Sequence, residues 1–156
     1  SDVLGIEAGK SKVHSGKLDF EGYEKVAKEI IKQFNNVSKV AITLRESISA
    51  SHNNWGGMLY DASEKKTYFA PLDLNGNYCP YQIKNIVDRV GGGDSFCAGL
   101  IFALCDNKSG NDNQFVINFA AAASCLAHSI EGDFNFSTKE EVMKLAGGNT
   151  SGRVVR

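Results

Sequence analysis

The segment from Gln82 to Asp106 constrains the fold of this chain more than any other part of the sequence. An extended stretch within Gln82–Val90 runs directly into three glycines, Gly91–Gly93, and residues Asp94–Asp106 read as a helix. The body of that helix, FCAGLIFALC, is apolar on every side, which is typical of a buried helix. A strand, a glycine turn and a buried helix in direct succession favour an α/β fold.

The other strand patterns predict a sheet that this chain does not complete. Residues 37–44 (VSKVAITL) form an apolar run without clean alternation, which indicates a strand buried on both faces, as in a parallel sheet. Residues 58–60 and 66–70 read as a hairpin around the turn DASEKK. Because a sheet buried on both faces needs more strands, we infer that the chain is part of a larger α/β domain, or that another chain completes its sheet.

Three further helices follow from apolar spacing and capping signals. Residues 20–34 repeat apolar side chains at helical spacing, with Asp19 as the candidate N-cap. A long helix is expected over 112–130, with Gly132 placed to end it. Ser137–Glu140 reads as a capping box that opens a last helix through Leu145.

Composition excludes several classes of function. Seventeen Lys and Arg against eighteen Asp and Glu give a net charge of −1, which does not support a surface for nucleic acid. No apolar stretch reaches the roughly 18 residues of a membrane helix, and the first residues lack the apolar core of a signal peptide. The four cysteines form no CxxC pair, and three lie in apolar helical patterns, which predicts a reduced cytoplasmic protein with buried thiols.

The glycine turn and Asp94 carry the clearest chemistry. Successive glycines leave backbone N–H groups open to a ligand, and a helix N-terminus adds roughly half a positive charge, so Gly91–Gly93 predict a site for phosphate or a developing anion. If the N–H groups hold a transferring phosphoryl group, Asp94 can orient and deprotonate the attacking hydroxyl. The alternative is a glycine-rich turn in which Asp94 is only a helix cap.

Other site patterns are weaker. Gly5–Ser11 approaches a Walker A loop but has three residues between its glycines instead of four. Phe96 stands where a dinucleotide fingerprint needs its last glycine. The three histidines show no metal spacing, and His128 is expected near a helix end, where a cation is favoured.

The stretch DRVGGGDSFCAGLI closely resembles the C-terminal signature of the PfkB, or ribokinase-like, carbohydrate kinases. The positions that fit this signature are Asp88, Gly91, Gly92, Gly93, Asp94, Ala98 and Gly99. Arg89 departs from it, because the family has a small or β-branched residue there. Two flanking stretches, AITLRESISASHNNWGGMLYD and LAHSIEGDFNFSTKEEV, resemble the 2-keto-3-deoxygluconate kinase branch.

The resemblance runs from Val3 to about Leu145 and corresponds to the C-terminal half of such a kinase. It implies that residues 1–156 form the C-terminal ATP-binding and catalytic part of a three-layer α/β/α domain with a partly parallel central sheet, with residues 147–156 as a flexible tail. The substrate-binding half, its lid and the Asn-x-x-Glu motif that organises Mg²⁺ do not match this chain.

The resemblance also implies roles for single residues. Asp94 would be the general base, and Gly91, Gly92 and Gly93 would form the anion hole for the γ-phosphoryl group. Thr43 and Arg45 match the strand end beside the ATP phosphates.

Four further positions are implied less specifically. Asn118, Ala121 and Ala122 match the helix that lines the adenine pocket, with plain helix packing as the alternative. Asp88 matches a position that binds a monovalent cation such as K⁺ in some members. Arg89 would meet a phosphate, the substrate carboxylate or a surface carboxylate.

The function implied is ATP-dependent phosphorylation of a sugar-acid hydroxyl, with 2-keto-3-deoxygluconate as the type substrate and Mg²⁺ held mainly by residues outside this chain. Two alternatives stay open: a non-catalytic nucleotide-binding fragment, and a ribokinase-like kinase for another sugar or alcohol. The isolated chain is expected to be inactive, and the intact enzyme to be a cytoplasmic homo-oligomer without nucleic-acid or membrane partners.

Overall fold

The computed structural model describes residues 19–106 and 112–147. The near-match to a Walker A loop at Gly5–Ser11 lies outside the described residues, as does nearly all of the tail expected to be flexible, 147–156. No helix in the described ranges is long and apolar enough to cross a membrane.

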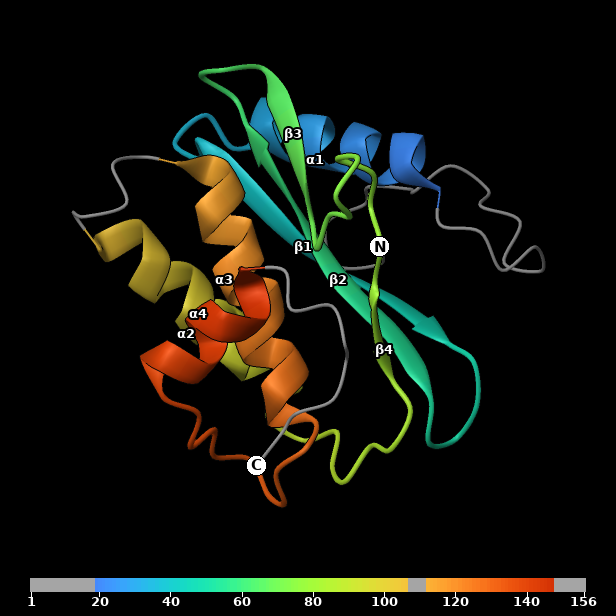
Figure 1. Ribbon diagram of the computed structural model, residues 1–156. Coiled ribbons are helices and arrows are strands. Elements are labelled where there is room, and N and C mark those ends of the chain that lie inside the picture. The colour runs from blue at the N-terminus through green and yellow to red at the C-terminus, as the bar shows by residue number, and fades with distance from the viewer. Residues whose placement is uncertain (1–18, 107–111, 148–156) are drawn as a thin grey trace.

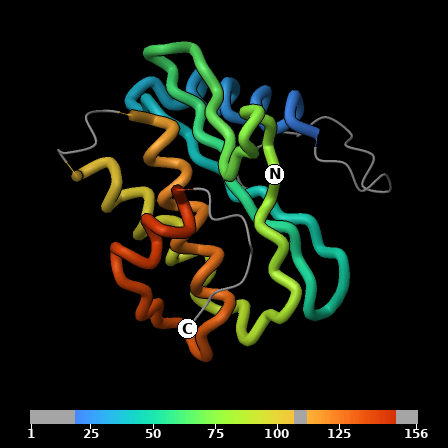
Figure 2. The backbone as a smooth tube through the Cα atoms, viewed as in Figure 1, coloured from blue at the N-terminus to red at the C-terminus, as the bar shows by residue number. Residues whose placement is uncertain are grey.

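The described chain forms three layers, with one helix on one face of a sheet and three helices on the other (Figures 1 and 2). The elements are α1 (Phe20–Gln33), β1 (Lys39–Ser47), β2 (Asn53–Asp61), β3 (Lys66–Ala70), β4 (Tyr81–Ile83), α2 (Gly92–Cys105), α3 (Asn113–Ala127) and α4 (Lys139–Ala146). The α/β class and the three-layer arrangement are therefore confirmed.

The sheet has β2 at its centre, with β1 along one edge and both β3 and β4 along the other. All these pairs are antiparallel, so the partly parallel pairing that was predicted is not found among the described strands. The reason is the short connections from β1 to β2 and from β2 to β3, which are hairpins and leave no length for a parallel crossover. The predicted hairpin of β2 and β3 is confirmed.

The alternation of side chains along each strand divides the core into two parts. On one face, Ala27 of α1 packs with Leu44, Met58 and Tyr60. On the other face, Leu59 packs with the helical layer, whose buried members include Phe96, Val116, Ile117 and the alanines of α3. The bounds of two strands differ from the prediction. β1 begins at Lys39 and continues to Ser47, where 37–44 was predicted, and β2 already begins at Asn53, where 58 was predicted.

The expectation that α2 is buried on every side is wrong. This helix packs mainly on α3, and its outer face carries Ile101 at 61%, Phe102 at 42% and Leu104 at 45% exposure. The expected burial of the thiols is also wrong for most cysteines: Cys79, Cys97 and Cys105 are exposed, and Cys125 alone is largely enclosed. Sequence shows that a helix is apolar, but only packing decides which faces have a partner.

Side-chain caps begin three of the helices. The carboxylate of Asp19 accepts from the Gly22 N–H at 2.9 Å, as predicted for the start of α1. Asp112 caps α3 in the same way. The capping box of α4 is formed by Thr138 and Glu141, one residue later than predicted. α3 ends at Ala127 with His128 as its C-cap, before the predicted end at Ile130.

A polar network joins the sheet to the start of α3. Asp61, which is 1% exposed, accepts hydrogen bonds from Lys39, from Ser63 and, at 2.8 Å, from the Asn113 Nδ2. Burial raises the pKa of Asp61, but these hydrogen bonds outweigh it and hold the pKa well below its usual range. The network satisfies the buried carboxylate and fixes the position of α3, whose other end lies beside the glycine turn.

Candidate active site at the glycine turn

Gly91 is the N-cap of α2 and has a left-handed backbone, with φ of 76°. Its carbonyl accepts from the Ser95 N–H at 2.8 Å, which closes the first turn of the helix. A Cβ at this position would lie 2.3 Å from the carbonyl oxygen of Asp133. Gly91 is therefore required twice, by its backbone conformation and by the close approach of the loop around Asp133.

Gly92 and Gly93 have opposite surroundings. A Cβ on Gly92 would lie 2.8 Å from Cε1 of His128, whereas a Cβ on Gly93 would meet nothing within 4 Å. The first N–H groups of a helix have no partner within the helix, and no side chain caps those of α2. The turn therefore has a packed side at Gly92 and an open side at Gly93, which suits an approaching anion.

Asp94 lies in the first turn of α2, next to this open side, and is exposed. Among the described residues, its carboxylate makes no hydrogen bond or ion pair with another side chain. The structure thus places the exposed Asp94 beside the open side of the glycine turn.

Asp88 fixes the entry to the turn. Its carboxylate accepts from the backbone N–H groups of Arg89 at 2.6 Å, Val90 at 3.0 Å and Gly132 at 3.0 Å. These hydrogen bonds lower the pKa of Asp88. The bond from Gly132 also holds in place the loop that closes over Gly91. In the part of the chain that the structure describes, no group of three His, Cys, Asp or Glu side chains could hold a metal ion.

Of the three partners expected for Arg89, the surface carboxylate is not found among the described residues. Its Nη2 donates to the backbone carbonyls of Ala50 and, at 3.5 Å, Ser49. Nearby, the Ile86 N–H donates to the carbonyl of Ser51 at 3.3 Å. Arg89 therefore ties the loop between β1 and β2 to the segment between β4 and the glycine turn, and the extended stretch predicted over 82–90 is a strand only to Ile83.

Thr43 and Arg45 lie on β1, opposite Gly57 and Trp55 in the antiparallel register. Partners in such a register point their side chains to the same face of the sheet. Trp55 contacts the ring of His128, with 4.6 Å between the centroids, so this is the face that carries the glycine turn. Thr43 and Arg45 therefore lie on the face of the sheet that carries the glycine turn, and their contact with phosphate stays a prediction.

The three adenine-pocket candidates on α3 do not behave alike. Asn118 is half-buried, and its Oδ1 accepts from Gln114 at 3.0 Å. Ala121 and Ala122 are both 0% exposed and belong to the core. The two alanines therefore serve helix packing, which was the stated alternative, and they are not accessible to a nucleotide in this structure.

Sequence reasoning missed the residues that lie beneath the turn, Ser124 and His128. His128 is 2% exposed, and burial lowers its pKa, so the expectation of a cation at the end of this helix is wrong. Its Nδ1 lies 2.8 Å from the Ser124 carbonyl oxygen and donates to it in the neutral ring. Their spacing of four residues on one helix was the signal available, but it does not reveal which face meets the turn.

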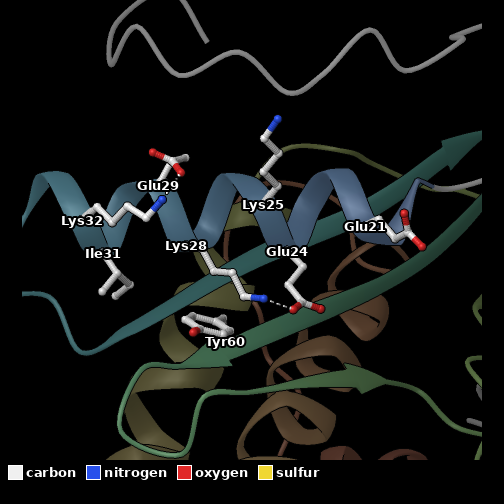
Figure 3. A pocket seen from close by; sticks show the side chains of 8 residues that line it. All are labelled: Glu21, Glu24, Lys25, Lys28, Glu29, Ile31, Lys32 and Tyr60. Carbon is white, nitrogen blue, oxygen red and sulfur yellow. Dashed lines mark hydrogen bonds and ion pairs between the residues drawn. The ribbon is translucent and has the colours of Figure 1, made fainter.

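A shallow depression on the opposite side of the sheet is separate from this site. It runs along α1 and ends at Tyr60 (Figure 3). Its charged lining includes an ion pair between Lys28 and Glu24 at 2.5 Å, and Lys28 also lies over the ring of Tyr60. This is a solvated helix face with paired charges.

The chain is similar in sequence and fold to parts of solved kinase structures. Over 94% of its length it matches 38% of a 2-dehydro-3-deoxygluconokinase from Thermotoga maritima, with 42% identity and a TM-score of 0.73. A PfkB family carbohydrate kinase from Listeria grayi matches 87% of the chain with 28% identity and a TM-score of 0.65. A protein described as a 2-keto-3-deoxygluconate kinase from Enterococcus faecalis, at 21% identity and a TM-score of 0.65, supports the fold alone.

No family model matches the chain, and no curated protein does so either. The chain spans less than two fifths of the length of each of these solved kinases. By sequence and by fold, it is similar to a part of the PfkB-family carbohydrate kinases, as the signature around Asp94 predicted.

Proposed function

We propose that this chain is the C-terminal ATP-binding and catalytic part of a carbohydrate kinase that phosphorylates a sugar-acid hydroxyl, with 2-keto-3-deoxygluconate as the type substrate. The observation that carries the proposal is the exposed Asp94 beside the open side of the glycine turn. The 42% identity to a 2-dehydro-3-deoxygluconokinase supports the substrate class.

In this proposal the turn and the carboxylate divide the work of phosphoryl transfer. The N–H groups at Gly92 and Gly93 and the positive end of α2 stabilise negative charge on the transferring γ-phosphoryl group. Asp94 accepts the proton of the attacking hydroxyl and orients its oxygen in line with the phosphorus. The water-exposed position of Asp94 leaves room for the sugar to reach it.

Other residues bind the nucleotide. Arg45 and Thr43 approach the phosphates from β1, and a guanidinium suits a phosphate by its charge and its forked N–H groups. Asn118 remains the adenine candidate on α3, although its Oδ1 is already paired with Gln114.

The proposal includes two cations, Mg²⁺ and a monovalent cation, and different observations bear on each. ATP-dependent kinases generally use Mg²⁺, which neutralises phosphate charge. The described residues offer no matching ligand group, so the Mg²⁺ ligands are assigned to the rest of the kinase. Asp88 would attract a monovalent cation such as K⁺ mainly by its negative charge, because both carboxylate oxygens already accept hydrogen bonds from backbone N–H groups.

The exposed apolar face of α2 supports the view that a larger domain surrounds this chain. A helix whose mean composition is apolar and whose outer face carries Ile101, Phe102 and Leu104 in solvent is typical of an interface. We propose that the remainder of the kinase covers this face. The intact enzyme is then a cytoplasmic homo-oligomer that acts on a small molecule. The isolated chain has little activity, because half of the groups that position the substrates are missing.

The test uses the kinase that contains this chain, with ADP release measured in a coupled assay. Asp94→Asn should lower kcat by roughly 10²–10⁴-fold, as expected for a general base, with ATP affinity nearly unchanged. Asp112→Asn is the matched control, because it makes the same change at the N-cap of α3 and Asn is an equally good cap. A kcat for Asp94→Asn within threefold of wild type contradicts the proposal.

The competing function is a non-catalytic nucleotide-binding module. Calorimetric ATP binding without ADP release, in the chain and in the longer protein alike, would establish it. A kinase for another sugar or alcohol differs only in substrate, and a thermal-shift screen of keto-deoxy acids and simple sugars separates that case.

A further inference from the structure

We infer that Ser124 and His128 are positioning residues that aim the backbone N–H of Gly93 at the bound anion. The identity of that anion rests on the proposed function, whereas the contacts described below are independent of it. Both residues lie at the end of α3, are almost fully buried and contact the first residue of α2. Neither touches the open side of the turn, so neither is a catalytic residue.

Ser124 fixes one peptide plane of the turn. Its hydroxyl, in a residue that is 0% exposed, donates to the carbonyl oxygen of Gly92 at 2.6 Å. In a planar trans peptide the carbonyl of one residue and the N–H of the next point in opposite directions. Holding the Gly92 carbonyl against α3 therefore directs the Gly93 N–H away from the Ser124 hydroxyl, in the first turn of α2, where the N–H groups have no partner within the helix.

His128 fixes the same residue by shape. Its ring occupies the space next to Gly92, where a Cβ would come within 2.8 Å of Cε1. The ring is itself held, since Nδ1 donates to the Ser124 carbonyl oxygen at 2.8 Å and the ring packs at a tilt of 58° against Trp55. The turn thus rests on a rigid, flat group that leaves no room for a side chain at Gly92.

His128 also holds the segment between β4 and the turn, through its backbone carbonyl. The Val87 N–H donates to the His128 carbonyl oxygen at 2.9 Å. The backbone on both sides of Gly91 is therefore attached to the end of α3, at Val87 by His128 and at Gly92 by Ser124. Two attachment points five residues apart determine the path of the glycines between them.

The first experiment measures amide hydrogen exchange in this chain without any ligand. Ser124→Ala should raise the exchange rate of the Ser95 amide, which donates to the Gly91 carbonyl at 2.8 Å, about 3–10-fold, which corresponds to one lost hydrogen bond. Ser129→Ala is the matched control, because its hydroxyl donates to the Leu126 carbonyl at 2.7 Å, at the same helix end and away from the turn. Equal exchange in the two variants overturns the role of Ser124.

The second experiment tests the contact between Gly92 and His128 by rescue. Gly92→Ala should destabilise the chain in urea unfolding, and His128→Ala should relieve that effect, because it removes the atoms that the new Cβ meets. If the Gly92→Ala effect is the same with and without His128, the contact does not position the turn and this part of the inference is wrong.

The third experiment connects positioning with turnover in the longer kinase. Ser124→Ala should lower kcat about tenfold and leave KM for the sugar acid within twofold, since a misdirected N–H loses contact with transition-state charge and not with the sugar. A general loss of folding would not produce this split. If Ser124→Ala changes amide exchange but the unmutated kinase shows no kinase activity, the proposed function alone is refuted. If Ser124→Ala changes neither amide exchange nor the kcat of an active kinase, the positioning role alone is refuted.

Discussion

Replacing Gly91 by alanine tests the geometry of the turn most directly. A left-handed backbone costs a non-glycine residue roughly 1–2 kcal/mol. The new Cβ would also lie 2.3 Å from the Asp133 carbonyl oxygen, so the loop must move. That movement strains the bond from the Gly132 N–H to Asp88, and forcing a side chain into occupied space costs about 1–2 kcal/mol more at this partly exposed loop. We expect Gly91→Ala to lose about 2–4 kcal/mol of unfolding free energy.

Gly93→Ala is the matched comparison two residues away. Gly93 belongs to the first turn of α2, its φ is not positive, and its Cβ would meet no atom within 4 Å. Alanine is favoured over glycine in a helix by up to about 1 kcal/mol, so this variant should be as stable as wild type or slightly more stable. Its new methyl group would instead stand on the open side and weaken binding of the phosphate.

The measurement is urea unfolding followed by the fluorescence of Trp55, the single tryptophan, which is buried against His128. The two variants should differ by about 2–5 kcal/mol, which appears as clearly separated midpoints. If Gly91→Ala stays within 0.5 kcal/mol (about a factor of two in the unfolding constant) of Gly93→Ala, the turn does not have the conformation described and the reasoning fails.

Three further outcomes are expected. Asp61→Ala should cost about 3 kcal/mol or more, because Lys39 and Asn113 lose their buried partner. Since folding lowers the pKa of Asp61, its contribution to stability should be present above the ordinary carboxyl pKa of 3.8 and be lost as the pH falls below it, which acid titration of unfolding checks. Burial also lowers the pKa of His128 from 6.5, so the folded state resists protonation of this ring and the free energy of unfolding should fall as the pH drops below about 6.5. In His128→Phe this dependence of stability on pH should disappear, and a dependence equal to that of wild type would show that another group causes it. Replacing Ile101 and Leu104 together by Lys should reduce binding of a hydrophobic dye by the isolated chain without loss of stability, and unchanged dye binding would place the accessible apolar surface elsewhere.

The sequence by itself determined the features that depend on neighbours in the chain. The start of α1 at Asp19 and the hairpin of β2 and β3 follow from local capping and turn chemistry. The glycine turn before an apolar helix, with Asp94 in its first turn, is likewise a local pattern. The glycine turn with Asp94 is the centre of the resemblance to the PfkB kinases, which explains why that resemblance was recognisable from sequence.

Only the tertiary structure decided the features that depend on distant partners. Arg89 binds the carbonyl of Ala50, 39 positions away, and the Ser124 hydroxyl meets the Gly92 carbonyl across 32 positions. The antiparallel sheet, the burial of His128 and the exposed face of α2 belong to the same group. An apolar or polar pattern states what a side chain can do, whereas burial and hydrogen bonding depend on which other element the fold brings against it.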